Sequence, residues 1–153
     1  MPTFTSDGLT LAYDDNVPPG GGERTIVLVH GFSSNRSEGW KRTGWYTAFD
    51  RRRIRCIALD QRGHGESAKP HEADAYTRAK LAGDVIALLD HLGLNRVDLF
   101  GYSMGSRTAL ATALLAQERA FLESLRRTSR YKVEDQQLIL ESANSSVVLM
   151  FTR

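Results

Sequence analysis

A serine between two glycines, Gly101-Tyr102-Ser103-Met104-Gly105, most constrains how this chain can fold. The apolar run before it, 97–100, predicts a strand, and the pattern over 107–115 predicts a helix. A sharp strand-to-helix turn around a serine is a nucleophile elbow. Its serine backbone is strained, so the residues two before and two after it need to be almost free of side chain. Gly101 and Gly105 supply that room. The alternative is a Gly-Ser turn between two core elements.

The residues before the elbow predict strands that alternate with helices. Residues 25–29 are a continuous, largely β-branched run, which is typical of a strand buried on both faces of a parallel sheet, and 54–59 predict the next buried strand. Residues 78–92 predict a helix that ends at Gly93, and 38–50 predict a second helix. Asp7-Gly8 predicts a hairpin turn. The predicted fold class is α/β, with a mostly parallel sheet and helices on both faces.

Glycine and proline stop abruptly at the elbow. All 13 glycines and all 4 prolines lie at or before Gly105. Because these residues punctuate chains, we expect two parts, 1–115 and 116–153. The second part predicts a short helix and β-meander: a helix over 117–127, a hairpin of 130–134 and 137–141 around Asp135, and a last strand over 147–152. The tail is a fused or foreign segment, or else 138–142 is a sixth strand of the main sheet.

Composition narrows the classes of partner and compartment. The net charge of +2 is too small to argue for nucleic acid. The sequence has no apolar run of ~18 residues and no signal-peptide pattern at its start, so we expect no membrane span. A single cysteine, Cys56, fits a reducing compartment, and we expect a cytoplasmic protein. No Cys/His or His/Glu cluster has metal-ligand spacing, so we expect neither metal nor cofactor.

Four motifs in order resemble the N-terminal half of an α/β-hydrolase over about residues 3–115. They are His30-Gly31-Phe32, Asp60-Gln61-Arg62-Gly63-His64-Gly65-Glu66-Ser67, Leu89-Asp90-His91-Leu92-Gly93 and the elbow. The resemblance implies that Ser103 is the nucleophile and that the backbone N–H groups of Phe32 and Met104 form an oxyanion hole. A serine rather than an aspartate at the elbow disfavours epoxide hydrolase or haloalkane dehalogenase chemistry. It favours esterase, lipase, C–C hydrolase or thioesterase chemistry on a small acyl or ester substrate.

The histidines depart from the pattern of that family, in which the acid and the histidine follow the serine. His30, His64, His71 and His91 all precede Ser103. A serine hydroxyl without a base is a poor nucleophile, and losing a triad member costs ~10⁴–10⁶-fold in turnover. His30 is an alternative base, although the resemblance implies a structural role for it. We therefore expect either a serine hydrolase with an incomplete triad or a catalytically silent fragment or fusion that serves as a scaffold or interaction protein.

The tail resembles another family. Its helix and meander are similar to the C-terminal part of a META domain, which implies no catalytic residues there. The resemblance rests on Ala116-Gln117-Glu118-Arg119-Ala120-Phe121-Leu122 through Arg130-Tyr131-Lys132-Val133-Glu134.

The strand that leads into the elbow would leave one edge of the main sheet unpaired, and an unpaired apolar edge is an aggregation hazard. We expect a tail strand to pair with that edge, or a second copy of the chain to cover it as a homodimer.

Overall fold

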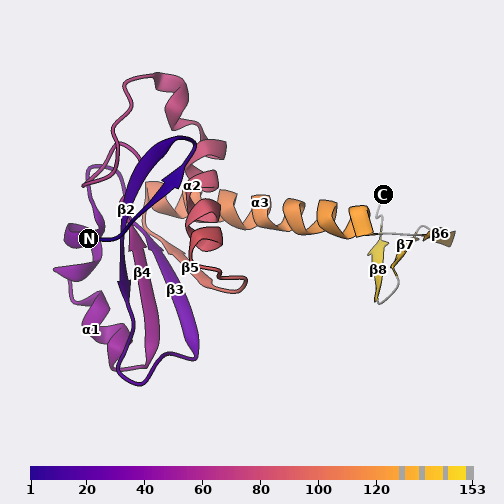
Figure 1. The fold of residues 1–153 in the computed structure, drawn as a ribbon, viewed down its shortest axis with the longest axis horizontal. Coiled ribbons are helices and arrows are strands. Elements are labelled where there is room, and N and C mark those ends of the chain that lie inside the picture. Colours follow the sequence, from indigo (N-terminus) through magenta and orange to yellow (C-terminus); the bar gives the residue numbers. More distant parts are fainter. Residues whose placement is uncertain (128–129, 135–136, 143–144, 151–153) are drawn as a thin grey trace. The chain divides into compact units, whose positions relative to one another are not determined.

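The computed structural model describes residues 1–127, 130–134, 137–142 and 145–150 (Figure 1). Its contacts divide the chain into two compact units, 1–113 and 114–153. The predicted assignment of domains to 1–115 and 116–153 stays a prediction. The elements up to the elbow are β1 (Thr3–Ser6), β2 (Leu9–Asn16), β3 (Arg24–Val29), the π-helical turn η1 (Ser37–Lys41), α1 (Trp45–Asp50), β4 (Ile54–Leu59), the 3₁₀ turn η2 (Ala73–Tyr76), α2 (Arg78–His91) and β5 (Asp98–Gly101).

The first unit is built on a five-stranded sheet in the order β1-β2-β4-β3-β5. β3 pairs in parallel with both β4 and β5, whereas β2 pairs antiparallel with β4. The predicted hairpin joins β1 to β2, and Asp7 and Gly8 have φ angles of 50° and 74°. Two positive φ angles are what a tight two-residue hairpin requires. The α/β prediction is confirmed as a mixed, mostly parallel sheet.

Alternation along the central strands separates two apolar cores. Val27 and Val29 of β3 belong to a core with Val85 and Leu88 of α2. Leu28, between them in sequence, belongs to the other core, against which α1 and η1 pack. Figure 1 shows α1 and α2 on opposite sides of the sheet. Each fully buried aliphatic side chain stabilises the fold by about 1.5–3 kcal/mol, so both faces of the central strands contribute.

The two helices before the elbow follow their sequence signals to different degrees. α2 is confirmed: its N-cap Thr77 accepts a hydrogen bond from the Lys80 N–H, and Gly93 beyond its C-terminus has φ 65°. The single helix predicted over 38–50 is wrong. η1 and α1 are separate there, because Gly44 has φ 84° and its left-handed backbone cannot continue a right-handed helix.

The tail contains the predicted helix and hairpin. The last helix of the chain, α3 (Met104–Arg127), is continuous. β6 (Arg130–Glu134), β7 (Gln137–Ser142) and β8 (Ser145–Met150) form their own antiparallel sheet. The predicted turn at Asp135 and the end of the predicted last strand lie outside the described residues. The sixth-strand alternative is wrong, because β7 lies between β6 and β8 in the sheet of the tail. Within the first unit β5 pairs with β3 alone, and the pairing of a tail strand with the elbow strand stays a prediction. The homodimer stays a prediction.

Cys56 lies in β4, fully buried. Burial raises the pKa of its thiol to about 12. Because the thiolate is the reactive form, only ~10⁻⁴ of such a thiol is ionised near pH 8. We expect iodoacetamide to leave the native protein unmodified and to label Cys56 fully in guanidinium chloride, as measured by intact mass. Rapid labelling of the native protein would contradict the burial.

Candidate active site

The predicted elbow is present between β5 and α3. β5 ends at Gly101, α3 begins at Met104, and Ser103 between them has φ 53°. The Tyr102 N–H donates to Val29 O at 3.1 Å, and the Gly105 N–H donates to Tyr102 O at 2.8 Å. These bonds hold the turn against the end of β3. A non-glycine residue in the left-handed region costs about 1–3 kcal/mol, which the surrounding bonds offset.

Both elbow glycines are sterically required. A Cβ on Gly105 would lie 2.0 Å from Val29 O, and a Cβ on Gly101 would lie 2.2 Å from Gly105 O. Backbone oxygens cannot move aside as the end of a flexible side chain can. The sequence argument that the turn needs room at these two positions is therefore confirmed.

The loop that follows β3 lies directly against Ser103. A Cβ on Gly31 would lie 3.3 Å from Ser103 Cβ, which places the neighbouring Phe32 beside the elbow. Within residues 1–127, no acceptor pairs with the N–H of Phe32 or of Met104, and Ser103 Oγ has no hydrogen-bond partner. Ser103 itself is exposed to solvent. The structure thus brings the three predicted residues together and leaves their polar groups available.

His30 is fully engaged in holding this loop. It is buried, and its Nε2 accepts a hydrogen bond from the Gln61 N–H at 3.1 Å. The proton must then be on Nδ1, which donates to Gly31 O at 2.8 Å. Burial lowers the pKa of His30, so the ring is neutral. Because both ring nitrogens are occupied, His30 has no lone pair to offer Ser103. These contacts agree with the structural role that the sequence resemblance implied for His30.

Gln61 joins three segments around the elbow. Its Nε2 donates to His30 O at 2.6 Å, and its Oε1 accepts from Thr108 Oγ1 of α3 at 2.9 Å. All three residues are buried. The loop after β3, the loop after β4 and the elbow helix are therefore connected by one chain of bonds. Sequence reasoning did not assign this role to Gln61.

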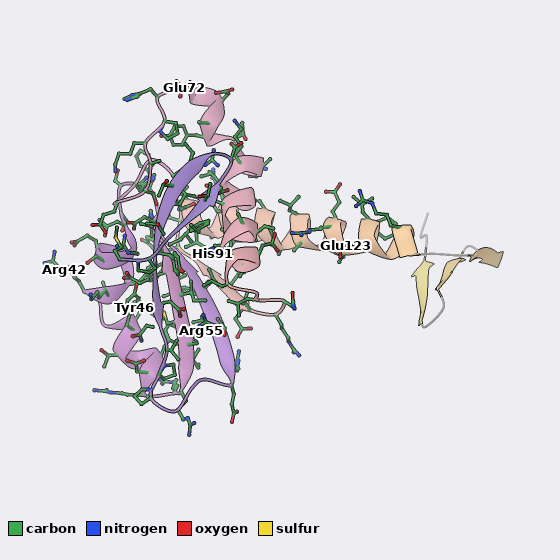
Figure 2. All side chains as sticks on the ribbon, in the orientation of Figure 1. Arg42, Tyr46, Arg55, Glu72, His91 and Glu123 are labelled. Atoms are coloured by element: carbon green, nitrogen blue, oxygen red, sulfur yellow. The ribbon has the colours of Figure 1, made fainter. Side chains whose placement is uncertain are left out.

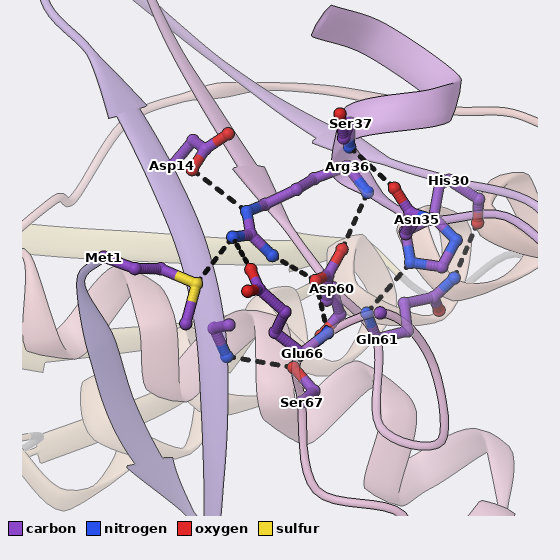
Figure 3. A network of polar contacts seen from close by, with 12 residues as sticks. Met1, Asp14, His30, Asn35, Arg36, Ser37, Asp60, Gln61, Glu66 and Ser67 are labelled. Atoms are coloured by element: carbon purple, nitrogen blue, oxygen red, sulfur yellow. Dashed lines mark hydrogen bonds and ion pairs between the residues drawn. The ribbon is translucent and has the colours of Figure 1, made fainter.

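Asp60 connects the same two loops through Arg36 (Figure 3). Its carboxylate accepts from the Arg36 N–H at 2.7 Å, from the Glu66 N–H at 2.9 Å and from the Arg36 guanidinium. Arg36 also binds Asp14 at 3.0 Å and pairs with Glu66. A Cβ on Gly65 would lie 2.1 Å from Asp60 Oδ2, which explains the glycine at that place in the loop. Because the buried charges are paired, the loop is held in one conformation.

Arg62 attaches the second loop to α2. Its guanidinium makes two bonds of 2.7 Å to the two carboxylate oxygens of Asp84, and both residues are 1% exposed. His64 bonds to Arg62 O at 3.1 Å and so holds its own loop. The sequence did carry a signal for this pair. Asp84 stands among buried positions of a helix, and an acid there needs a partner.

The remaining histidines, His71 and His91, make no hydrogen bond with Ser103 Oγ in the described structure. His71 is exposed. His91 ends α2 and lies beside the rings of Phe4 and Tyr13, at centroid distances of 6.2 and 5.9 Å (Figure 2). Within the described part of the chain, no three His, Cys, Asp or Glu residues gather as a metal site, and no helix is both long and apolar enough to cross a bilayer.

Phe32 lines two hollows. One, of about 420 Å³, has Ser103 in its wall and is lined mostly by aromatic and loop residues: His30, Gly31, Phe32, Ser34, Glu38, Gly39, Trp40, Thr43, Trp45, Phe100, Tyr102 and Ser103. The other, of about 540 Å³, is lined by Phe32, Ser33, Arg62, Gly63, His64, Tyr76, Leu81 and Met104. Both volumes lie in the range of small-molecule sites.

The family follows from comparison with known proteins. A family model described as the alpha/beta hydrolase fold matches residues 24–120. The chain belongs to this family. An epoxide hydrolase of Caballeronia sordidicola is 34% identical to this alpha/beta hydrolase over 116 residues, which are 76% of the chain and 33% of the relative.

Solved structures of related hydrolases superpose on most of the chain. The epoxide hydrolase VrEH1 from Vigna radiata has a TM-score of 0.67 at 26% identity, over 76% of this chain and 36% of that one. The enol-lactonase from Burkholderia xenovorans LB400 has a TM-score of 0.62 at 31% identity, over 70% of this chain and 39% of that one. This alpha/beta hydrolase chain therefore spans less than two fifths of the length of these relatives.

Proposed function

We propose that this chain is a serine hydrolase of the alpha/beta hydrolase fold that acts on an ester or a related acyl bond, with Ser103 as the nucleophile. The observation that carries the proposal is the position of Ser103 at the strained turn, exposed and without a hydrogen-bond partner in residues 1–127. The turn is at the N-terminus of α3, where the helix dipole favours negative charge.

The proposed chemistry is nucleophilic attack by Ser103 Oγ on the acyl carbonyl. The Oγ–C bond forms, the alcohol of the ester leaves, and the serine proton passes to the leaving group or to solvent. The Phe32 and Met104 N–H groups would donate to the oxyanion that develops on the carbonyl oxygen. One such donor is commonly worth about 3–4 kcal/mol of transition-state stabilisation.

The choice of an acyl bond rests on the type of nucleophile. The relatives include epoxide hydrolases, but the elbow of this chain carries a serine, which favours acyl transfer. The similarity to an enol-lactonase supports this choice, since an enol lactone is a cyclic ester. We further propose that the triad is incomplete in these 153 residues, because no histidine follows Ser103 and His30 is engaged.

A labelling experiment tests the nucleophile separately from turnover. We expect a fluorophosphonate probe to modify the native chain slowly and on Ser103 alone, as located by peptide mass spectrometry. Turnover of p-nitrophenyl acetate should stay close to the uncatalysed rate, since a missing triad member costs ~10⁴–10⁶-fold. Ser103→Ala should lose the label. Ser106→Ala, a control at an exposed serine three residues further on, removes a hydroxyl that donates to Ser103 O at 2.6 Å and should retain the label.

Two results would contradict parts of the proposal. Labelling that persists in Ser103→Ala would show that another residue is the nucleophile. Fast turnover that disappears in Ser103→Ala would keep the nucleophile but refute the incomplete triad.

A second candidate is a catalytically silent protein that serves as a scaffold or interaction partner in the cytoplasm. The observation that favours it is the outer edge of β5, which pairs with no other strand of the first unit. A homodimer across that edge would be its simplest form, and sedimentation velocity at rising concentration would detect it. The resemblance of 116–153 to a META domain would also favour this candidate, because a META domain carries no catalytic residue.

A further inference from the structure

Three aromatic rings from three different elements meet beside the elbow. Trp40 comes from η1, Trp45 from the start of α1 and Phe100 from β5. Their ring centroids are 5.9 Å apart for Trp40 and Trp45, 5.7 Å for Trp40 and Phe100, and 5.2 Å for Trp45 and Phe100. These separations are those of attractive aromatic pairs, so the three rings form one cluster. We call it the aromatic wall.

The aromatic wall is open on one side. Trp40 is 3% exposed and forms its base, whereas Trp45 and Phe100 are 37% and 38% exposed. All three line the hollow of about 420 Å³ that also has Ser103 in its wall. Contiguous exposed rings next to a polar reactive group are the usual composition of a small-molecule site.

The buried base of the wall carries an unsatisfied donor. Trp40 Nε1 is buried and has no hydrogen-bond partner within the described residues. Buried indole N–H groups usually find an acceptor, and leaving one unpaired costs about 1–3 kcal/mol. Trp40 also lines the hollow, so a ligand oxygen that reached its indole N–H would satisfy this donor. The unpaired N–H belongs to one of the three rings and adds a polar feature to the aromatic wall.

The charge of the hollow favours a neutral ligand. The one carboxylate that lines it, Glu38, is paired with Arg42 at 2.7 Å. The ion pair leaves little net charge to attract a cation toward the ring faces. The rings themselves offer flat apolar contact, which an aromatic group matches best.

We propose that the aromatic wall binds the acyl side of the substrate, and that this acyl group carries a neutral aromatic ring. Esters of the phenylacetyl type represent the class. The reaction of such an ester rests on the proposed function of Ser103, whereas its binding rests on the aromatic wall alone. The two can therefore be tested apart.

Binding is measured with a chain that cannot react. In Ser103→Ala, methyl phenylacetate should bind at least ~10-fold more tightly than methyl acetate by ligand-observed NMR, as expected for about 1.4 kcal/mol of ring contact. Phe100→Leu, which keeps an apolar side chain but removes the ring, and Trp45→Ala should each reduce that preference several-fold. Phe121→Ala is the matched control: it removes a ring that is 37% exposed on α3 and not part of the hollow.

Reactivity is measured with two sulfonyl fluorides. The Ser103 Oγ–S bond forms, the S–F bond breaks, and fluoride and the hydroxyl proton go to solvent. Phenylmethanesulfonyl fluoride should label Ser103 faster than methanesulfonyl fluoride, after each rate is divided by that of N-acetylserine amide. The ratio should fall toward one in Trp45→Ala.

Each outcome decides something. Equal binding of the two methyl esters, or an equal loss of preference in Phe121→Ala, would refute the aromatic wall as a binding site. Tighter binding of benzyltrimethylammonium than of methyl phenylacetate would refute a neutral ligand. Selective binding with no sulfonylation of Ser103 would leave the site standing and refute the proposed function. Sulfonylation of Ser103 at equal relative rates by the two reagents would support the proposed function and refute the aromatic wall as a binding site.

Discussion

Replacing Gly105 with alanine should destabilise the protein by about 4 kcal/mol or more, the range seen when backbone strain or overpacking cannot relax. The added Cβ would lie 2.0 Å from Val29 O and 2.5 Å from His30 O. To relieve the clash, α3 would have to move away from the end of β3, which would break the elbow. Urea unfolding followed by tryptophan fluorescence measures the change, since Trp40 is 3% exposed and reports on the core.

Gly83→Ala is the matched control for this prediction. Gly83 lies inside α2, and nothing lies within 4 Å of a Cβ built there. An alanine in a helix interior is more favourable than glycine by about 0.5–1 kcal/mol, so this variant should be slightly more stable than the parent. A Gly105→Ala protein that unfolds at the same urea concentration as the parent would show that the elbow is not packed as described.

The second large effect is expected from Asp84→Ala, which should cost about 3–5 kcal/mol. The substitution leaves the Arg62 guanidinium, 1% exposed, without the carboxylate that accepts two of its hydrogen bonds. Its remaining contacts are a hydrogen bond to Ala75 O and the Asp7 carboxylate at 3.5 Å, and Asp7 is 53% exposed, so it compensates only part of the charge. Urea unfolding again measures the loss.

Two variants test the reason for that effect. Asp98→Ala removes a carboxylate from the Arg24 pair, whose side chains are 69% and 50% exposed, and should cost less than about 1 kcal/mol. Arg62→Met combined with Asp84→Leu removes both buried charges and should recover much of the stability lost in Asp84→Ala. A double variant as unstable as the single one would refute an uncompensated charge as the cause.

The elbow could be predicted because its requirements are local. The strand before Ser103, the helix after it and the two glycines lie within a short stretch, and the clash that Gly101 avoids is with Gly105 O of the same turn. The atom that a Cβ on Gly105 would meet, Val29 O, belongs to a distant strand, but the motif already requires a small residue at that position. The same holds for the Asp7-Gly8 hairpin, where both φ angles are positive. The roles of Ser103, Phe32 and Met104 stay predictions, because chemistry depends on groups that no local pattern fixes.

Features that depend on distant partners were missed. The pairs Arg62–Asp84 and Arg36–Asp60 join residues far apart in sequence, and a charged residue in a loop motif does not reveal which acid it binds. The strands of the tail have apolar runs that fit either sheet, so their own antiparallel pairing could not be told from pairing with β5. The helix break at Gly44 could not be predicted from the sequence, because a glycine inside a helix costs only about 1 kcal/mol and tertiary packing can outweigh that cost.

The parallel pairing of β5 with β3 has a consequence for how the molecule folds. Val29 and Gly101 are register partners, although most of the first unit lies between them in sequence. Contacts of such long separation close late, because the chain entropy must be lost before they form. The hydrogen bond from Tyr102 to Val29 that holds the serine turn belongs to this late step. We therefore expect Ser103 to acquire its strained backbone late in folding, after the pairing of β5 with β3 has brought the end of β3 to the elbow.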